Sequence, residues 1–136
     1  MVLFPSDEWT KEIMEVVNND EEYARIAKNF EGDFYYIVTP DGGLKEKTVM
    51  YFDYWHGKCR NAYLVEDVNN HKAPAYRITA KLSTFHAMFE KRLDFMKATL
   101  TRKVKVKGNM MKMMKDKKVA DRITELLQSV PIKLPE

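Results

Sequence analysis

The alternation in residues 103–107 is the feature of this sequence that most constrains the fold. Lysine and valine alternate there, and a period of two predicts a strand with a solvent-exposed lysine face and a buried valine face. Gly108 interrupts the pattern, and Asn109 is a favourable N-cap for a helix that begins at Met110. The segment therefore predicts a strand, a turn and a helix in immediate succession.

The helix that follows carries Met110, Met111, Met113 and Met114, with Lys112 among them. At about 100° per residue, the methionines fall within an arc of roughly 160°, and the lysine lies on the opposite side. We therefore expect the methionines to face the protein interior and Lys112 to face water. Because methionine fills irregular space, the cluster indicates either ordinary core packing or an adaptable pocket for an apolar molecule.

The rest of the chain carries helix and strand patterns that are separated by caps and turns. Ser6 is expected to cap a first helix, and Asn19 or Asp20 a second. A third helix, capped by Ser83, is expected to carry its apolar face over residues 85–96. Strands are predicted at residues 34–39, 48–55, 59–65, 76–80 and 103–107, and a last helix at residues 117–130.

Residues 75–114 resemble the C-terminal half of the sterol carrier protein domain, the family of intracellular non-specific lipid-transfer proteins. The lysine–valine strand that ends in Gly108 is the most specific match, and the hairpin at residues 57–62 fits as well. The order of elements agrees over nearly the whole chain. One position departs from the family pattern, because Arg102 stands where the family often has glycine, just before the lysine strand.

The resemblance and the element pattern together predict an α+β fold. We expect a five-stranded, largely antiparallel sheet with helices packed mainly on one face, in a single domain that spans residues 1–136. The resemblance further implies a hydrophobic tunnel that holds a lipid without any covalent step. Its expected lipid-binding walls are Phe85, Met88, Phe89, Met96, Met110, Met111, Met113, Met114, Ile123, Leu126 and Leu127.

Charge is distributed unevenly along the chain. Residues 1–58 contain 12 acidic and 6 basic side chains, whereas residues 59–136 contain 8 acidic and 17 basic ones. The basic patch Lys103, Lys105, Lys107, Lys112 and Lys115 is expected to contact anionic membrane, where each lysine contributes about 1 kcal/mol. A solvated face is the alternative. Nucleic acid is not an expected partner, because no stacking aromatics interleave with these lysines.

The chain lacks the signals of export and membrane insertion. No apolar run approaches the ~20 residues of a membrane span, and the N-terminus has neither a basic segment nor a long apolar one. The single cysteine, Cys59, excludes an intrachain disulfide and suits a reducing compartment. We therefore expect a cytoplasmic protein.

Catalytic patterns are weak. His86 and Glu90 are spaced as neighbours on a helix, but one such pair is a poor zinc pattern and favours a surface charge pair. Cys59 is either a thiol whose pKa is lowered by Arg60 or, as we favour, a buried inert thiol. No phosphate loop or dinucleotide fingerprint is present. We expect no catalytic residues, no metal site and no cofactor.

These observations favour a non-enzymatic protein that binds and transfers apolar ligands, such as fatty acyl chains, acyl-CoA or sterol-like molecules. The alternative is a protein-interaction or accessory module of a lipid-metabolising enzyme, whose apolar face meets a partner. Aromatic residues crowd the predicted meander, and they either pack the sheet or form a homodimer interface. They are Tyr35, Tyr36, Tyr51, Phe52, Tyr54, Trp55 and Tyr63.

Overall fold

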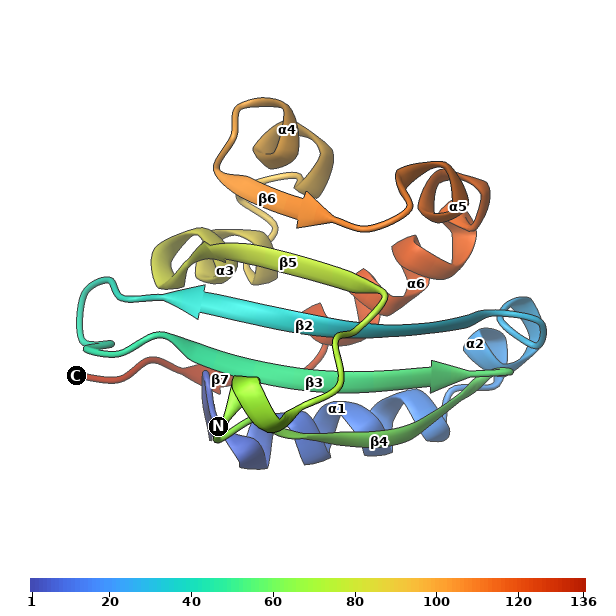
Figure 1. The fold of residues 1–136 in the computed structure, drawn as a ribbon, viewed down its shortest axis with the longest axis horizontal. Coiled ribbons are helices and arrows are strands. Elements are labelled where there is room, and N and C mark those ends of the chain that lie inside the picture. Colours follow the sequence, from blue (N-terminus) through green and yellow to red (C-terminus); the bar gives the residue numbers. More distant parts are fainter.

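The computed structural model describes all of residues Met1–Glu136, and its centre is a five-stranded sheet with the strand order β4-β3-β2-β5-β6 (Figure 1). Strands β2 and β5 pair in parallel, and the other neighbouring pairs are antiparallel. The predicted α+β class is therefore confirmed. The strands are β2 (Glu31–Thr39), β3 (Thr48–Trp55), β4 (Lys58–Leu64), β5 (Tyr76–Lys81) and β6 (Val104–Lys107).

Six helices accompany the sheet, and a short second sheet joins the two ends of the chain. Strand β1 (Val2–Leu3) pairs in parallel with β7 (Ile132–Lys133), which the sequence patterns did not predict. A 3-10 turn covers Val68–Asn70. The helices are α1 (Asp7–Asn18), α2 (Glu21–Ile26), α3 (Leu82–Phe89), α4 (Phe95–Leu100), α5 (Met110–Lys115) and α6 (Lys117–Gln128).

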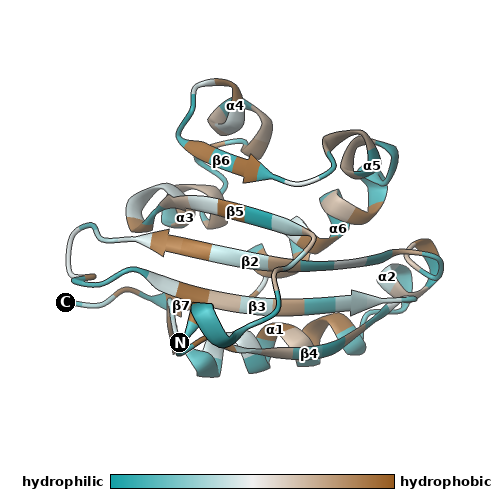
Figure 2. Ribbon diagram, viewed as in Figure 1, coloured by the Kyte–Doolittle hydropathy of each residue, from teal (hydrophilic) through white to brown (hydrophobic).

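One face of the sheet, here called the inner face, is apolar and is covered by α1, α3 and α6 (Figure 1). Alternate side chains of each strand point to it, and Figure 2 shows the resulting mixture of hydrophobic and hydrophilic positions along the strands. These side chains join a core cluster of 29 buried residues. The strand residues in this cluster are Phe34, Tyr36 and Val38 of β2, Met50, Phe52 and Tyr54 of β3, Cys59 and Ala62 of β4, Tyr76, Ile78 and Ala80 of β5, and Val104 of β6.

The opposite, outer face is partly covered by the loop between β4 and β5. His71 of this loop lies among three tyrosines, with its two ring nitrogens 2.7 Å from the Tyr35 hydroxyl and 2.6 Å from the Tyr63 hydroxyl. Its ring centroid is 4.6 Å from that of Tyr51. Part of the aromatic meander is therefore used by the protein's own loop, and a homodimer through this face stays a prediction.

The N-terminal helices begin where their capping side chains predict. The Ser6 hydroxyl accepts the Trp9 amide at 3.0 Å, and an Asp20 carboxylate oxygen accepts the Tyr23 amide at 2.8 Å. Asp20 is therefore the N-cap of α2, and Asn19 is the C-cap of α1. Both carboxylate-rich first turns suit the positive end of the helix dipole.

The prediction of a single helix that is capped by Ser83 and extends to residue 96 is wrong in two respects. Lys81 is the N-cap of α3, without a side-chain cap bond, and the Ser83 amide donates instead to an Asp41 carboxylate oxygen at 3.0 Å. The helix ends at Phe89, and a second helix, α4, starts after Asp94. The apolar spacing continues across this break without a Gly or Pro to mark it, so periodicity alone could not reveal it.

Arg122 of α6 ties the C-terminal helix to the start of α2. Its guanidinium donates to both Asp20 carboxylate oxygens, at 2.8 and 2.6 Å, and it also contacts Glu22 and Glu125. The hydrogen bond from Arg122 holds the pKa of Asp20 below its usual value, and burial opposes this only in part. Because the folded pKa is lowered, this pair stabilises the fold above the unfolded-state pKa of Asp20 and loses its effect as the pH falls through the folded pKa.

We predict that Asp20→Asn lowers the free energy of unfolding at pH 7 by about 1 kcal/mol, since asparagine is an equally good N-cap but cannot form the ion pair. The difference from the wild type should shrink as the pH falls below about 4, the ordinary pKa of an aspartate, because the carboxyl group then becomes protonated first in the unfolded chain and, at lower pH, in the folded protein. Urea unfolding at pH 7 and at pH 3 measures it. A difference that is the same at both pH values would contradict the role of the charge.

Candidate apolar ligand site

A small apolar pocket lies between the inner face of the sheet and the C-terminal helices. Its volume is about 20 Å³, which is room for about one water-sized sphere. The pocket is enclosed by side chains from the start of β2, from β5, from α5 and from α6. They are Phe30, Phe34, Tyr76, Met113, Asp116, Ala120 and Ile123.

Helix α6 positions one wall of this pocket. Its apolar residues recur at the spacing of a single helix face, and Val119, Ile123, Leu126 and Leu127 are all buried. This face lies against the sheet and α3, where the Gln128 side-chain amide also donates to the Met88 carbonyl at 3.0 Å. The wall is therefore part of the main core rather than a separate lid.

Tyr76 supplies the opposite wall and a buried polar atom. Its ring stacks on Phe34 with centroids 4.8 Å apart, as expected from the parallel register of these two residues. The Tyr76 hydroxyl is buried without a hydrogen-bond partner, and burial raises the pKa of Tyr76 above its usual value. The pocket is thus apolar, with one free neutral hydroxyl and the Asp116 carboxyl among its lining groups.

The structure brings together only part of the predicted lipid-binding set. Phe85, Met88, Ile123, Leu126 and Leu127 are buried in the core. Phe89 and Met113 pack against that core while remaining half-buried. Of the predicted residues, Met113 and Ile123 line the pocket, and contact of the others with a ligand stays a prediction.

The expectation that four methionines of α5 face the interior is wrong. Met110, Met111 and Met114 are 39%, 84% and 68% exposed, and Met96 of α4 is 53% exposed. Helix α5 has six residues and none of them is buried, so the helix lies at the surface and most of its wide arc of methionines stays in contact with solvent. Met113 is the one methionine of α5 that packs on the core.

Several pocket residues were missed because their proximity depends on long-range pairing. Phe34 and Tyr76 stand in different strands, and only the parallel pairing of β2 with β5 makes them neighbours. Phe30 precedes β2, and Ala120 and Asp116 lie at the start of α6. Alternation within each strand puts Phe34 and Tyr76 on a face with other apolar residues, but it contains no information on which strand lies beside which.

The predicted basic patch is exposed, but its members point in different directions. Lys105 and Lys107 stand opposite Thr79 and Arg77 in the β5–β6 register and so share the outer face with them. Lys103 and Lys115 are exposed at the two ends of this region. The Lys112 ammonium donates to the Glu31 carbonyl at 3.1 Å, so one of its hydrogen bonds is made within the protein.

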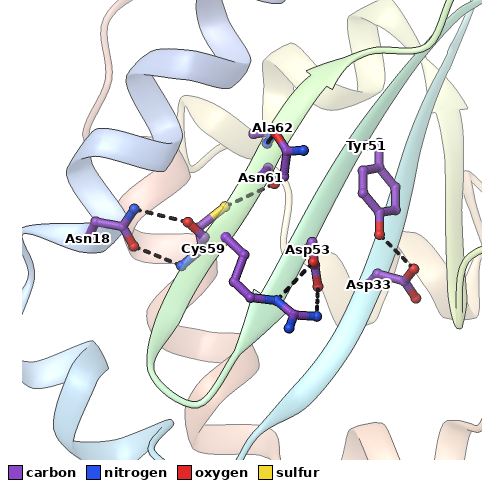
Figure 3. Close-up of polar contacts among 8 residues, drawn as sticks. Asn18, Asp33, Tyr51, Asp53, Cys59, Asn61 and Ala62 are labelled. Atoms are coloured by element: carbon purple, nitrogen blue, oxygen red, sulfur yellow. Dashed lines mark hydrogen bonds and ion pairs between the residues drawn. The ribbon is translucent and has the colours of Figure 1, made fainter.

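The polar groups that the sequence marked as weak catalytic candidates are engaged in structural contacts (Figure 3). The Arg60 guanidinium pairs with the Asp53 carboxylate at 3.0 Å. Cys59 is buried, its backbone amide donates to Asn18 at 2.7 Å, and burial raises the pKa of its thiol to about 12. The interpretation as a buried, unactivated thiol is therefore confirmed.

His86 and Glu90 form the predicted pair along α3, with 3.4 Å between the imidazole and carboxylate atoms. The structure contains no group of three or more His, Cys, Asp or Glu side chains placed to hold a metal ion. Six of the seven residues that line the pocket are hydrophobic, and Asp116 is the one that is not.

A sequence profile of the SCP-2 sterol transfer family matches residues 11–121. The chain belongs to this family. A search among curated proteins finds no match. The SCP-2 family and its fold support lipid binding or transfer in general, which agrees with the apolar pocket described above.

Solved structures of other SCP-2 proteins share the fold. A crystal structure of sterol carrier protein 2 is 25% identical, with a TM-score of 0.80, and the match covers 93% of this chain and 98% of that one. A conserved hypothetical protein of Thermus thermophilus, described as possibly a sterol carrier protein, is 24% identical with a TM-score of 0.79, over 93% of this chain and 88% of that one.

The same fold also occurs within a larger enzyme. The sec-alkylsulfatase Pisa1 of a Pseudomonas species matches with a TM-score of 0.58 and 13% identity, over 92% of this chain but 16% of the enzyme chain. This likeness concerns the fold alone.

Proposed function

We propose that this SCP-2 protein binds an apolar lipid between the inner face of its sheet and helices α5 and α6, and carries it between membranes without chemical change. The candidate ligands are fatty acyl chains, acyl-CoA and sterol-like molecules. The observation that carries the proposal is the apolar pocket of Phe34, Tyr76, Met113 and Ile123, in a chain whose family is one of sterol transfer.

Ligand entry requires the pocket to widen, because about 20 Å³ does not hold an acyl chain. Helix α5 is the element best placed to move, since it is short and packs on the core through Met113 while three of its methionines face solvent. Burying ten methylenes contributes about 8 kcal/mol of gross binding free energy. That gain exceeds the loss of the contacts of one half-buried methionine, about 2 kcal/mol.

Direct ligand detection tests the proposal. Organic extraction of the freshly purified protein, followed by mass spectrometry, is expected to recover a lipid in near-stoichiometric amount. A fluorescent fatty acyl probe should bind saturably to the delipidated protein and be displaced by unlabelled lipid. An extract without lipid, together with a probe signal that rises linearly and never saturates, would refute lipid binding.

The edge of the molecule formed by α4, β6 and α5 has the composition of a membrane-docking surface (Figure 1). Met96 and Leu100 of α4 are exposed, as are three methionines of α5, and residues 102–118 contain eight basic side chains and one acidic one. No helix of the structure has the length and apolarity to cross a bilayer. We propose that this edge rests on anionic membrane, with apolar tips in the interface and lysines near headgroups.

Charge reversal at Lys105 tests the docking surface. Lys105→Glu is expected to weaken binding to vesicles that contain anionic lipid about tenfold, because it replaces one attractive charge by a repulsive one. Lys58→Glu, at an exposed position of β4 on the opposite edge of the sheet from β6, makes the same change in net charge away from this surface and should have a smaller effect. Co-sedimentation with the vesicles measures both, and equal losses in the two variants would rule out a localised surface.

The accessory-module alternative is less favoured, because the match to sterol carrier protein 2 spans 98% of that chain. The continuous core of 29 residues supports the proposal that residues 1–136 form one domain. The free, buried Cys59 is compatible with the proposed location in the cytoplasm.

A further inference from the structure

A second and larger cleft lies between α3 and the segment that joins α4 to β6. Its volume is about 460 Å³, it opens to solvent, and it shares no lining residue with the apolar pocket. Three basic side chains, two hydroxyl side chains and two apolar ones line it, and no acidic residue does. They are Lys81, Ser83, Thr84, Ala87, Leu93, Arg102 and Lys103.

The three basic side chains of this cleft are free to meet a ligand. None of them takes part in an ion pair within the protein. Asp41 is the carboxylate close to this region, and it accepts the Ser83 amide at 3.0 Å. The Ser83 side chain also hydrogen-bonds to Asp41, and Asp41 attracts Lys81 as well. An anion in the cleft would therefore be held chiefly by Arg102 and Lys103, with Lys81 and the Thr84 hydroxyl beside them.

Arg102 occupies its place in the cleft at a cost to the backbone. Its φ is +64°, in the left-handed region that glycine adopts freely and that strains other L-residues. Lys91 has a similar φ of +62° but does not line the cleft. Both residues follow the C-cap of a helix, where a left-handed residue closes the last turn: the Arg102 amide donates to the Thr99 carbonyl and the Lys103 amide to the Ala98 carbonyl. The ending of α4 therefore accounts for the conformation of Arg102 and sets the place from which its side chain reaches the cleft.

We propose that this cleft binds a phosphate group. A guanidinium grips phosphate oxygens with two parallel hydrogen bonds, ammonium groups add charge, and hydroxyls supply further donors. Leu93 and Ala87 give the cleft an apolar wall for the carbon skeleton that bears the phosphate. The phosphate belongs either to a lipid headgroup or to a water-soluble phosphate ester. The proposal stands independently of lipid binding in the apolar pocket.

Two glycine variants separate charge from position. Arg102→Gly and Lys91→Gly each remove one positive charge and place glycine at a positive φ, but only the first residue lines the cleft. Glycine removes the strain of the left-handed conformation, which stabilises the folded state, but it also gives the unfolded chain more conformational freedom, which destabilises the fold. The two effects act in opposite directions. Both variants should therefore melt within a few degrees of the wild type, which shows that any loss of binding is not a loss of folding.

Titration calorimetry at low ionic strength measures the binding. The probes are inorganic pyrophosphate, dihexanoyl phosphatidic acid below its micellar concentration, and dihexanoyl glycerol as the matched lipid without phosphate. The wild type and Lys91→Gly should bind at least one phosphorylated probe with the same affinity. Arg102→Gly should bind that probe about tenfold more weakly, because it lacks one group that forms charge-assisted hydrogen bonds. Binding should weaken with added salt.

The pattern across probes identifies the source of the phosphate. Binding of pyrophosphate indicates a soluble ester, whereas binding of phosphatidic acid alone indicates a lipid headgroup. The proposal is overturned if neither phosphorylated probe binds saturably, if dihexanoyl glycerol binds as well as phosphatidic acid, if Arg102→Gly binds like the wild type, or if both glycine variants lose affinity equally.

Discussion

Replacement of Gly108 by alanine is expected to lower the free energy of unfolding by about 3 kcal/mol. Gly108 has a φ of +137°, which strains any residue with a side chain. A Cβ at this position would lie 2.5 Å from Cδ1 of Tyr76 and 2.7 Å from the Ala75 carbonyl oxygen. Both strain and collision therefore oppose the substitution, at the turn where β6 leads into α5.

The control for this prediction is Gly42→Ala. Gly42 also has a positive φ, of +56°, but no atom lies within 4 Å of the place its Cβ would take. This substitution should cost about 1 kcal/mol from strain alone. Urea unfolding of the two variants gives the comparison, and similar losses of stability would show that the contact with Tyr76 is unimportant.

The collision at Gly108 has a consequence for the site as well. Tyr76 lines the apolar pocket, so displacement of its ring should disturb the pocket wall in any fraction of Gly108→Ala that remains folded. Affinity for the fluorescent fatty acyl probe should accordingly fall in this variant and stay unchanged in Gly42→Ala. The two readouts link the turn before α5 to ligand binding.

Met113→Lys is expected to weaken binding of the acyl probe about 30-fold, because an ammonium in the pocket wall must lose its hydration when an apolar ligand enters, at about 2 kcal/mol. Met111→Lys is the matched control. Met111 lies two residues away on the same helix and is 84% exposed, so its replacement should leave probe affinity within about twofold of the wild type.

Folding of the Met113 variant needs its own check, because Met113 packs against the core. Circular dichroism and thermal melting show whether Met113→Lys is folded, and Met113→Gln provides a milder polar change of similar shape. Loss of probe affinity in both Met113 variants, with native spectra, supports the proposed pocket. Equal affinity in the Met113 and Met111 variants would place the ligand elsewhere.

Much of the fold could be predicted because local patterns are strong in this chain. The alternation in residues 103–107 correctly placed β6 and its buried Val104, and Asn109 is the N-cap of α5, accepting the Lys112 amide at 3.1 Å. The strand at Thr48–Trp55 has the predicted bounds. In each case the structure depends on residues within one turn or one strand, so the sequence holds the needed information.

The candidate site was harder to predict, because a site depends on which elements meet. The apolar residues of α3 and α6 were correctly expected to be buried, but burial in a core and contact with a ligand carry the same signature in a sequence. Arg102 illustrates the same limit. Its departure from the family glycine was visible in the sequence, whereas the cleft that its side chain lines became visible only in the structure.

By itself, the sequence determined which side of the lysine strand and of the last helix is apolar, where the first helices begin, and where glycine ends the lysine strand. The tertiary structure alone decided that Phe34 and Tyr76 stack, that Met113 faces the pocket while Met111 faces water, and that three unpaired basic side chains surround one cleft. The physical reason is one of range. Periodicity and capping act between residues a few positions apart, whereas a pocket forms where chain segments many residues apart pack together.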